Sequence, residues 1–345
     1  MKILEGKIMR VAEIHNGKIE VVTVDDIKLG DRTGAIVKVL GCGLCGSDIV
    51  KFREHISKEG TVLGHEIVAQ IVDINSKSGF KKGDKIVASH HIPCFRCAYC
   101  KGKSYSMCKH FKETNIVPGG FSEYVYLSEE HLLNVTHLIP KNLTEEEVSF
   151  YEPLGCCVRA VKRASLSPLS DVLVIGLGTI GLLMAQTLKA FGMTVYGCDL
   201  MQDRIDRANA LGIRAFNSKN LDEAHKYIYE HTHDIGVECV FMTSGADAAI
   251  DVALQTVRLG GKILVFSSTP RNTGYKNNDI YYKELTVMGS YSPRPQDLET
   301  SLQLLTNGEV VVKHLTTVYK LDDIQKAFDD TIANKIMKAY IKIGE

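Results

Sequence analysis

The chain has 345 residues, of which 45% are hydrophobic and 24% are charged, and this is the balance of a globular protein long enough for two domains. Lysine and arginine together number 41, as do aspartate and glutamate, so the formal net charge is zero. This balance argues against a nucleic-acid-binding protein that depends on bulk positive charge.

No stretch of the sequence has the pattern of a membrane or export segment. The first ten residues contain no apolar core, so we expect no secretory signal. The longest apolar run, residues 172–185, is interrupted by glycines and is too short to span a bilayer. We therefore expect a cytoplasmic protein without a membrane segment. Ten cysteines in such a chain are expected to be reduced and partly metal-bound, whereas a disulfide framework is typical of short secreted chains.

The first 150 residues are predicted to be rich in β-structure. Short β-branched or alternating segments, separated by glycine and charged turns, predict strands over residues 35–40, 67–74, 85–88 and 122–127. We expect no helix of any length in this region before residues 144–148. There Thr144 and Glu147 form the pattern of a capping box.

The middle of the chain alternates strands and helices. The predicted strands cover residues 172–175, 194–198, 237–242, 263–266 and 285–289. One predicted helix follows the glycine-rich segment 176–181 and ends at residue 191. Two more cover residues 203–211 and 246–259. Alternation of this kind with glycine at the junctions predicts a doubly wound parallel sheet with helices on both faces, the Rossmann arrangement of an α/β protein.

After residue 290 the pattern is helix, strand, helix and strand, over residues 297–306, 317–319, 322–333 and 338–343. This tail is too short to bury a core of its own, so we expect it to return to the N-terminal domain. The predicted domains are therefore a discontinuous one, residues 1–154 with 291–345, and a nucleotide-binding one, residues 155–290.

A glycine-rich motif follows the first strand of the predicted parallel sheet. Its cofactor-binding candidates are Gly176, Gly178, Ile180 and Gly181 of a G-x-G-x-x-G pattern. These glycines permit a tight turn and allow backbone N–H groups to approach a pyrophosphate at a helix N-terminus. Asp199 ends the next strand, where a carboxylate accepts hydrogen bonds from ribose hydroxyls and repels a 2′-phosphate, which favours NAD over NADP. Arg204 is an opposing signal, because an arginine can receive that phosphate. A glycine-rich turn without a ligand is the alternative.

A second group of candidate residues lies near residues 45 and 65. Cys45 is followed, twenty residues later, by His65 and Glu66. A thiolate, an imidazole and a carboxylate are the ligand types of a catalytic zinc ion with an open coordination position. Cys42 and Cys45 together could instead be a redox C-x-x-C pair, but the neighbouring sequence is unlike the βαβ unit that such a pair requires.

Four closely spaced cysteines form a third group. Cys94, Cys97, Cys100 and Cys108 can surround one tetrahedral zinc ion, which then needs no further ligand and has a structural role. The last spacing is longer than in ferredoxin cluster motifs, and no proline follows the fourth cysteine. A nucleic-acid-binding zinc knuckle is a further alternative, which the neutral net charge disfavours.

Together these motifs resemble the zinc-dependent medium-chain dehydrogenases, the superfamily of alcohol and polyol dehydrogenases. The resemblance extends over nearly the whole chain and implies a GroES-like β-barrel catalytic domain with an inserted Rossmann domain. It implies that Cys45 and His65 bind the catalytic zinc, that Asp48 supports His65, and that Ser47 takes part in proton transfer. Many members of the superfamily have a histidine five residues after the catalytic cysteine. This chain has Val50 there, so the proton must leave through ribose, water or His55.

The third protein ligand of the catalytic zinc is left open by the sequence. The dipeptide Glu152-Pro153 resembles the sorbitol, threonine and sugar dehydrogenase branch, in which Glu66, Glu152 or both complete the site. Cys156 and Cys157 are competing candidates, which we rank below the glutamates. Phe52, His90, Tyr291 and Arg294 could line a substrate pocket, although each is equally compatible with ordinary packing.

The resemblance implies an oxidoreductase that transfers hydride from a secondary alcohol, such as a polyol, a sugar or a sugar phosphate, to NAD. A threonine-type amino alcohol or a simple alcohol is an alternative substrate, and an inactive binding module with the dehydrogenase fold is an alternative of a different class. One catalytic and one structural zinc ion, a small-molecule partner, and a homodimer or homotetramer are also implied.

Overall fold

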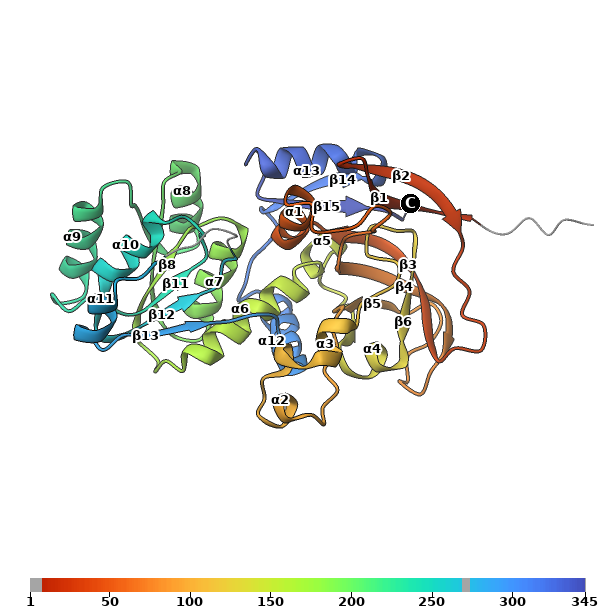
Figure 1. Cartoon of the computed structure of the whole chain (residues 1–345), viewed down its shortest axis with the longest axis horizontal. Helices are drawn as coiled ribbons and strands as arrows, with labels where there is room; N and C mark the ends of the chain where they lie inside the picture. Colours follow the sequence, from red (N-terminus) through yellow and green to blue (C-terminus); the bar gives the residue numbers. More distant parts are fainter. Residues whose placement is uncertain (1–7, 269–273, 345) are drawn as a thin grey trace, which may run out of the picture. The chain divides into compact units, whose positions relative to one another are not determined.

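The computed structural model describes residues 8–268 and 274–344 (Figure 1). The chain divides into two compact units, and each is described by itself. The first contains the described parts of Met1–Pro153, Arg294–Thr306 and Val312–Glu345, and the second those of Leu154–Pro293 and Asn307–Val311. The sequence predicted that the first domain would end at residue 154 and resume at residue 291. The expected catalytic role of the first part and nucleotide-binding role of the second stay predictions.

The first unit is built on a mostly antiparallel sheet whose strands run in the order β14-β15-β3-β4-β5-β7, with β6 paired to β3 (Figure 1). A separate hairpin of β1 and β2 turns at Asn16 and Gly17, both of which have positive φ. The strands are β1 (Ile8–His15), β2 (Lys18–Asp25), β3 (Gly34–Gly43), β4 (Glu66–Asn75), β5 (Lys85–Ala88), β6 (Tyr124–Ser128), β7 (Thr136–Leu138), β14 (Thr316–Lys320) and β15 (Lys338–Lys342).

The end of the chain is part of this unit. Strand β15 pairs antiparallel with β3, so that Tyr340 lies opposite Gly43. The ring of Phe328, on helix α13 (Ile324–Ile332), packs edge-on against Phe52 and Phe121, with centroids 5.3 and 6.2 Å away. The core of the first unit is therefore assembled from residues near both ends of the chain.

Helices also occur early in the first unit, so the expectation of none before residue 144 was wrong. The early ones are α1 (Gly46–Arg53), α2 (Ala98–Lys101), α3 (Lys109–Glu113) and α4 (Glu129–Asn134). The capping box of Thr144 and Glu147 is confirmed at the start of α5 (Glu145–Val148). Helix α12 (Pro295–Thr306) belongs to the first unit, and α6 (Tyr151–Ala164) passes from the first unit into the second.

The second unit contains the predicted parallel sheet, with the strand order β10-β9-β8-β11-β12-β13. The order reverses between β8 and β11, and in such sheets ligands bind at the carboxyl ends of the strands at this reversal. The strands are β8 (Asp171–Ile175), β9 (Thr194–Asp199), β10 (Arg214–Asn217), β11 (Val237–Met242), β12 (Val257–Val265) and β13 (Thr286–Gly289). The helices are α7 (Thr179–Ala190), α8 (Gln202–Ala210), α9 (Leu221–His231), α10 (Ala248–Thr256) and α11 (Asn277–Tyr282).

Two details of the second unit differ from the sequence-based expectation. Helix α10 ends at Thr256, because β12 already begins at Val257 and contains the glycine pair that we had placed before it. The register between β11 and β12 shifts at this point, and Gly260 has a φ of +66°. Strand β10 and helix α9 had not been predicted. No helix in the described ranges is long and apolar enough to cross a membrane.

We predict that Phe328→Ala lowers the free energy of unfolding by about 3–5 kcal/mol, because it leaves a cavity between α13 and the rings of Phe52 and Phe121. Denaturation followed by circular dichroism measures this change. The control is Lys326→Ala on the same helix, which removes an exposed ion pair with Asp330 and is expected to cost less than about 1 kcal/mol. Equal effects of the two substitutions would contradict the integration of the C-terminal segment into the core.

Candidate functional site

Helix α1 begins directly after Cys45, which is its N-cap residue. The carboxylate of Asp48 accepts a hydrogen bond from the backbone N–H of Cys45 at 3.3 Å, as a residue at the third helical position does in a capping box. It also accepts one from the N–H of Gly64 at 3.5 Å. Buried Asp48 therefore fixes the start of α1 against the loop that precedes His65.

The structure brings Cys45, His65 and Glu66 together. The candidate ligand atoms of these three residues all lie within 4.8 Å of one another. Nδ1 of His65 is 3.3 Å from the Asp48 carboxylate, which leaves Nε2 as the ring nitrogen free to bind a metal. A sulfur, a nitrogen and an oxygen donor at this separation fit a zinc ion with an open coordination position.

Glu66 is held by a residue from the far end of the chain. Its Oε2 atom accepts a hydrogen bond from Nζ of Lys338, and both side chains are buried. Oε1 of Glu66 is buried without a hydrogen-bond partner in the described part of the chain. A buried carboxylate oxygen with no donor is a position that a cation would satisfy. The carboxylate of Glu66 can occupy this position only because Gly43 has no side chain, since a Cβ on Gly43 would lie 2.0 Å from Oε2 of Glu66.

Negative charge dominates the surroundings of His65. Burial disfavours the charged form of this imidazole, but Asp48 and Cys45 outweigh burial and raise the pKa of His65 well above its usual range. An environment that stabilises a proton on His65 stabilises a metal cation as well. Burial of Lys338 is likewise outweighed by Glu66 and Cys45, which raise the pKa of this lysine.

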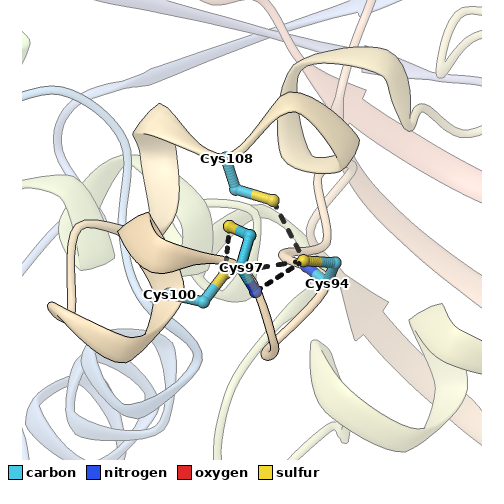
Figure 2. A group of neighbouring side chains, drawn as sticks. All are labelled: Cys94, Cys97, Cys100 and Cys108. Atoms are coloured by element: carbon cyan, nitrogen blue, oxygen red, sulfur yellow. Dashed lines mark hydrogen bonds between the residues drawn. The ribbon is translucent and has the colours of Figure 1, made fainter.

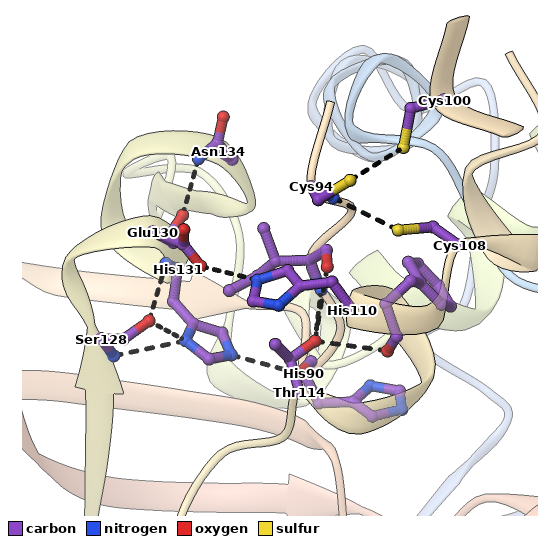
Figure 3. Close-up of polar contacts among 12 residues, drawn as sticks. His90, Cys94, Cys100, Cys108, His110, Thr114, Ser128, Glu130, His131 and Asn134 are labelled. Carbon is purple, nitrogen blue, oxygen red and sulfur yellow. Dashed lines mark hydrogen bonds and ion pairs between the residues drawn. The ribbon is translucent and has the colours of Figure 1, made fainter. Parts of the chain in front are cut away.

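Two further histidine rings lie in succession beside that of His65. The ring centroid of His90 is 4.5 Å from that of His65, and His91 follows at 3.8 Å from His90. Nδ1 of His90 is buried without a partner among the described residues. The backbone carbonyl of His90 accepts a hydrogen bond from Nε2 of His131 at 3.1 Å, and His131 in turn contacts Ser128 (Figure 3). Segment 89–91 is thus anchored through its backbone, while the His90 ring faces His65.

The four closely spaced cysteines also converge. Their sulfur atoms lie within 4.8 Å of one another, and they come from the short helices and turns of one lobe (Figure 2). The backbone N–H of Cys97 points at the sulfur of Cys94 at 3.4 Å, and that of Cys94 at the sulfur of Cys108 at 3.5 Å. All ten cysteines of the chain are free in the structure.

The chemistry of this cysteine group fits a metal ion. Backbone N–H groups of Arg96 and Cys97 lower the pKa of Cys94 to about 6, because they stabilise its thiolate. Burial and the neighbouring sulfurs raise the pKa of Cys100 to about 12. Four thiols this close cannot all lose their protons unless a cation lies among them. A divalent zinc ion would supply that charge, and four thiolates would complete a closed site around it.

In the second unit, the glycine motif forms the loop between β8 and α7. Gly176 has a φ of +91°, a conformation that favours glycine, and Gly178 is the N-cap residue of α7. A Cβ on Gly181 would lie 1.8 Å from the carbonyl oxygen of Gly176, so only glycine permits this close turn. The loop backbone can therefore approach a pyrophosphate at the N-terminus of α7, as the motif requires. Ile180 lies in the first turn of α7 and is half-buried.

Asp199 has a second role that the sequence did not reveal. Its carboxylate accepts hydrogen bonds from three backbone N–H groups, those of Leu177 at 2.7 Å, Leu200 at 2.7 Å and Met201 at 3.0 Å. Arg204 lies 3.5 Å from the same carboxylate. Asp199 thus ties the glycine loop to the end of β9, and a carboxylate still has lone pairs available for a ribose hydroxyl.

Other candidates from the sequence are placed as follows. Ser47 is exposed on the first turn of α1, close in sequence to Cys45. Glu152 is buried in the first turn of α6 and is not part of the Cys45 group. Arg294 donates to both carboxylate oxygens of Asp297. Sequence reasoning missed Lys338, whose only local signal is a lysine at the start of an apolar strand.

Comparison with known proteins gives consistent matches to one group of enzymes. Residues 30–137 match the alcohol dehydrogenase GroES-like domain family, and residues 179–307 match the zinc-binding dehydrogenase family. The chain is 30% identical to sorbitol dehydrogenase from Bacillus subtilis, over 95% of this chain and 94% of that protein. It is 31% identical to D-arabitol-phosphate dehydrogenase from Enterococcus avium, over 89% of each.

A solved structure agrees with these sequence matches. The fold is similar to that of 2R,3R-butanediol dehydrogenase from Bacillus subtilis, with a TM-score of 0.84 and 26% identity over 97% of this chain and 99% of that one.

We predict that the purified protein contains about two zinc ions per chain, one for each ligand group. Cys45→Ser should lose the ion beside His65 and keep the other, because the two groups share no ligand. Cys97→Ser should lose the second ion and lower the melting temperature, since the lobe is held together around it. Elemental analysis and thermal denaturation measure these effects.

The matched control is Cys42→Ala, which removes a buried thiol that lies outside both ligand groups. This variant should retain both ions. A Cys45→Ser protein with unchanged zinc content would show that the Cys45 group does not bind the metal.

Proposed function

This chain belongs to the zinc-dependent medium-chain dehydrogenase superfamily, in its polyol dehydrogenase branch, and from that premise we propose that it oxidises a secondary hydroxyl group of a polyol, a sugar or a sugar phosphate with NAD. The chain is an oxidoreductase that acts on a secondary alcohol and uses zinc and a nicotinamide cofactor. The convergence of Cys45, His65 and Glu66 is the observation that carries the proposal.

The names of the similar proteins narrow the range of candidate substrates. Sorbitol, arabitol phosphate and xylulose are named for similar proteins, and all are polyols, polyol phosphates or ketoses. They favour such a substrate over a threonine-type amino alcohol or a simple alcohol. An inactive binding module is also disfavoured, because the ligand atoms remain close together and Oε1 of Glu66 lies buried without a partner within the described residues.

We assign Cys45, His65 and Glu66 to the catalytic zinc, with Glu152 as a further proposed ligand, and Cys94, Cys97, Cys100 and Cys108 to a structural zinc. When bound, the catalytic zinc supplies a Lewis acid to the alcohol and the nicotinamide supplies an acceptor for hydride. Asp48 fixes the tautomer of His65 through Nδ1. Lys338 neutralises Oε2 of Glu66 and leaves Oε1 to face the cation.

Ser47 is the proposed acceptor of the hydroxyl proton at its Oγ atom. It is exposed on the first turn of α1, so the proton can continue to water or to the cofactor ribose. Val50 supplies no imidazole on this helix. The ring of His55 lies near Gly17 in the β1–β2 turn, 3.8 Å from the position that a Cβ of Gly17 would occupy. Water or ribose is therefore the route that we favour.

The cofactor is proposed to bind at the loop between β8 and α7, through Gly176, Gly178, Ile180 and Gly181. Asp199 supports NAD rather than NADP, because its carboxylate would repel a 2′-phosphate. Arg204 does not offset this repulsion fully, since its guanidinium is already 3.5 Å from Asp199.

A homodimer or homotetramer is also proposed. Strand β13 is at one edge of the described sheet of the second unit, and Val287 on this strand is exposed. Tyr281 and Tyr282, just before it, are exposed as well. An open edge with exposed apolar side chains is typical of strand pairing between copies. The cytoplasmic location expected from the sequence stays a prediction.

We predict that at least one compound in a panel of sorbitol, xylitol, arabitol and their phosphates reduces NAD with a kcat/KM of about 10⁴ M⁻¹ s⁻¹ or more. NADH absorbance measures the reaction. Threonine, 2,3-butanediol and ethanol serve as competing substrates, and Cys45→Ser as the inactive control. Preference for threonine or for simple alcohols would refute the proposed substrate class, and no activity with any compound would favour the binding module.

We predict that Asp199→Ala raises the KM for NAD and reduces the preference for NAD over NADP at least tenfold, because it removes both the repulsion of a 2′-phosphate and the bond to the N–H of Leu177. Steady-state kinetics with the two cofactors test this. Asp203→Ala, a nearby exposed carboxylate on α8, is the control and should leave the ratio unchanged. An unaltered ratio in Asp199→Ala would refute the argument for NAD.

A further inference from the structure

Lys51 has a position on α1 that the proposed mechanism does not use. It lies four residues after Ser47 and three residues after Asp48. Residues at these separations share one face of a helix, so Lys51 lies one turn beyond the proposed proton acceptor and beyond the carboxylate that supports His65. Cys45 begins the same helix. The side chain of Lys51 therefore starts from the helix that carries part of the candidate zinc site.

The ammonium group of Lys51 has no carboxylate partner and no hydrogen-bond acceptor within the described residues, although the residue is half-buried. Other lysines of this unit pair directly with buried acids, as Lys338 does with Glu66 and Lys335 with Asp330. A half-buried cation without a direct ion-pair partner is a candidate for binding an anion from outside the chain.

The charge of Lys51 affects the pKa of neighbouring titratable groups. Burial is the main factor that lowers the pKa of His90 well below its usual range and that of His91 to about 4, and the charge of Lys51 lowers both further. Burial raises the pKa of Asp48, but His65 and, to a smaller extent, Lys51 lower it. The charge is thus felt both within α1 and at the segment of His90 and His91. Lys51 shares a helical face with Asp48, whose carboxylate lies 3.3 Å from Nδ1 of His65, and this places Lys51 near the candidate zinc site.

We propose that Lys51 binds an oxyanion of the substrate, and that this enzyme therefore acts on a polyol or sugar that carries a phosphate monoester or a carboxylate. The inference rests on the proposed oxidation of a polyol or sugar. A neutral hydroxyl group would leave Lys51 without an ion-pair partner, whereas an oxyanion forms a charge-assisted hydrogen bond with it. Phosphate and carboxylate share this chemistry, and the experiment separates them.

The test compares one carbon skeleton in three forms, namely sorbitol, sorbitol phosphate and gluconate, with the zinc-loaded enzyme and NAD. The wild-type enzyme should have a higher kcat/KM for one charged form than for sorbitol. Lys51→Gln should raise the KM for that form about 10- to 100-fold, and that for sorbitol less than about twofold, because one charge-assisted hydrogen bond is lost. Lys51→Arg, which keeps the charge, should retain most of the preference.

A second measurement does not depend on turnover of the charged compound. Inorganic phosphate should bind to the zinc-loaded enzyme in isothermal titration calorimetry, and should bind at least tenfold more weakly to Lys51→Gln. Added salt should weaken this binding, as it does for charge pairs. The matched control is Arg53→Gln, which removes one positive charge from the same helix at an exposed position and should change neither result.

Several outcomes would overturn the role of Lys51. Preference for neutral sorbitol, a preference for the charged form that survives in Lys51→Gln, or an equal effect of Arg53→Gln would each do so and leave polyol oxidation intact. A rise in the KM for NAD alone would assign Lys51 to the cofactor instead. Activity with none of the polyols, sugars or charged derivatives would overturn the proposed function and this inference together.

Discussion

The buried ion pair between Glu66 and Lys338 is the interaction on which the first unit most depends. The two residues are 272 positions apart, and the pair connects the first residue of β4 with the first residue of β15. A carboxylate removed from water is unfavourable unless a cation compensates it, so removal of either partner is expected to cost about 3–5 kcal/mol. Strand β15 pairs with β3, which pairs with β4, and the ion pair therefore connects the two strands that flank β3, next to the candidate zinc ligands.

The same ion pair determines which oxygen of Glu66 faces the candidate metal site. Lys338 occupies Oε2 of Glu66, so only Oε1 is available to a cation. Asp48 is held by the N–H groups of Cys45 and Gly64 and by His65, which makes it a fixed negative charge beside the candidate ligands. Negative charge is thus concentrated around His65 in groups that cannot move away from one another. A divalent ion relieves this repulsion, which is why a site of this composition favours zinc over a proton on the imidazole.

Patterns that are local in sequence were sufficient to predict much of the fold and of both ligand groups. The spacing of Cys94, Cys97, Cys100 and Cys108 and the glycine motif are such patterns, and β5 and β11 have the predicted bounds. Helix α1 was missed because its capping box begins with Cys45, an unusual N-cap residue, and its short sequence has only weak apolar periodicity. Lys338 was missed because no local pattern reports a partner so distant in sequence. The backbone bonds of Asp199 depend on how the two loops meet, which the sequence does not encode in a short motif.

Helix α1 carries several residues of the candidate site. Its N-cap residue is a candidate ligand, and Ser47, Val50 and Lys51 follow within two turns. Because a helix fixes these side chains relative to one another, a change at one position alters the site without altering the fold. Valine at position 50 removes a proton carrier, and lysine at position 51 adds a charge. The two together fit the proposed exit of the proton through solvent or ribose and the proposed binding of a charged substrate.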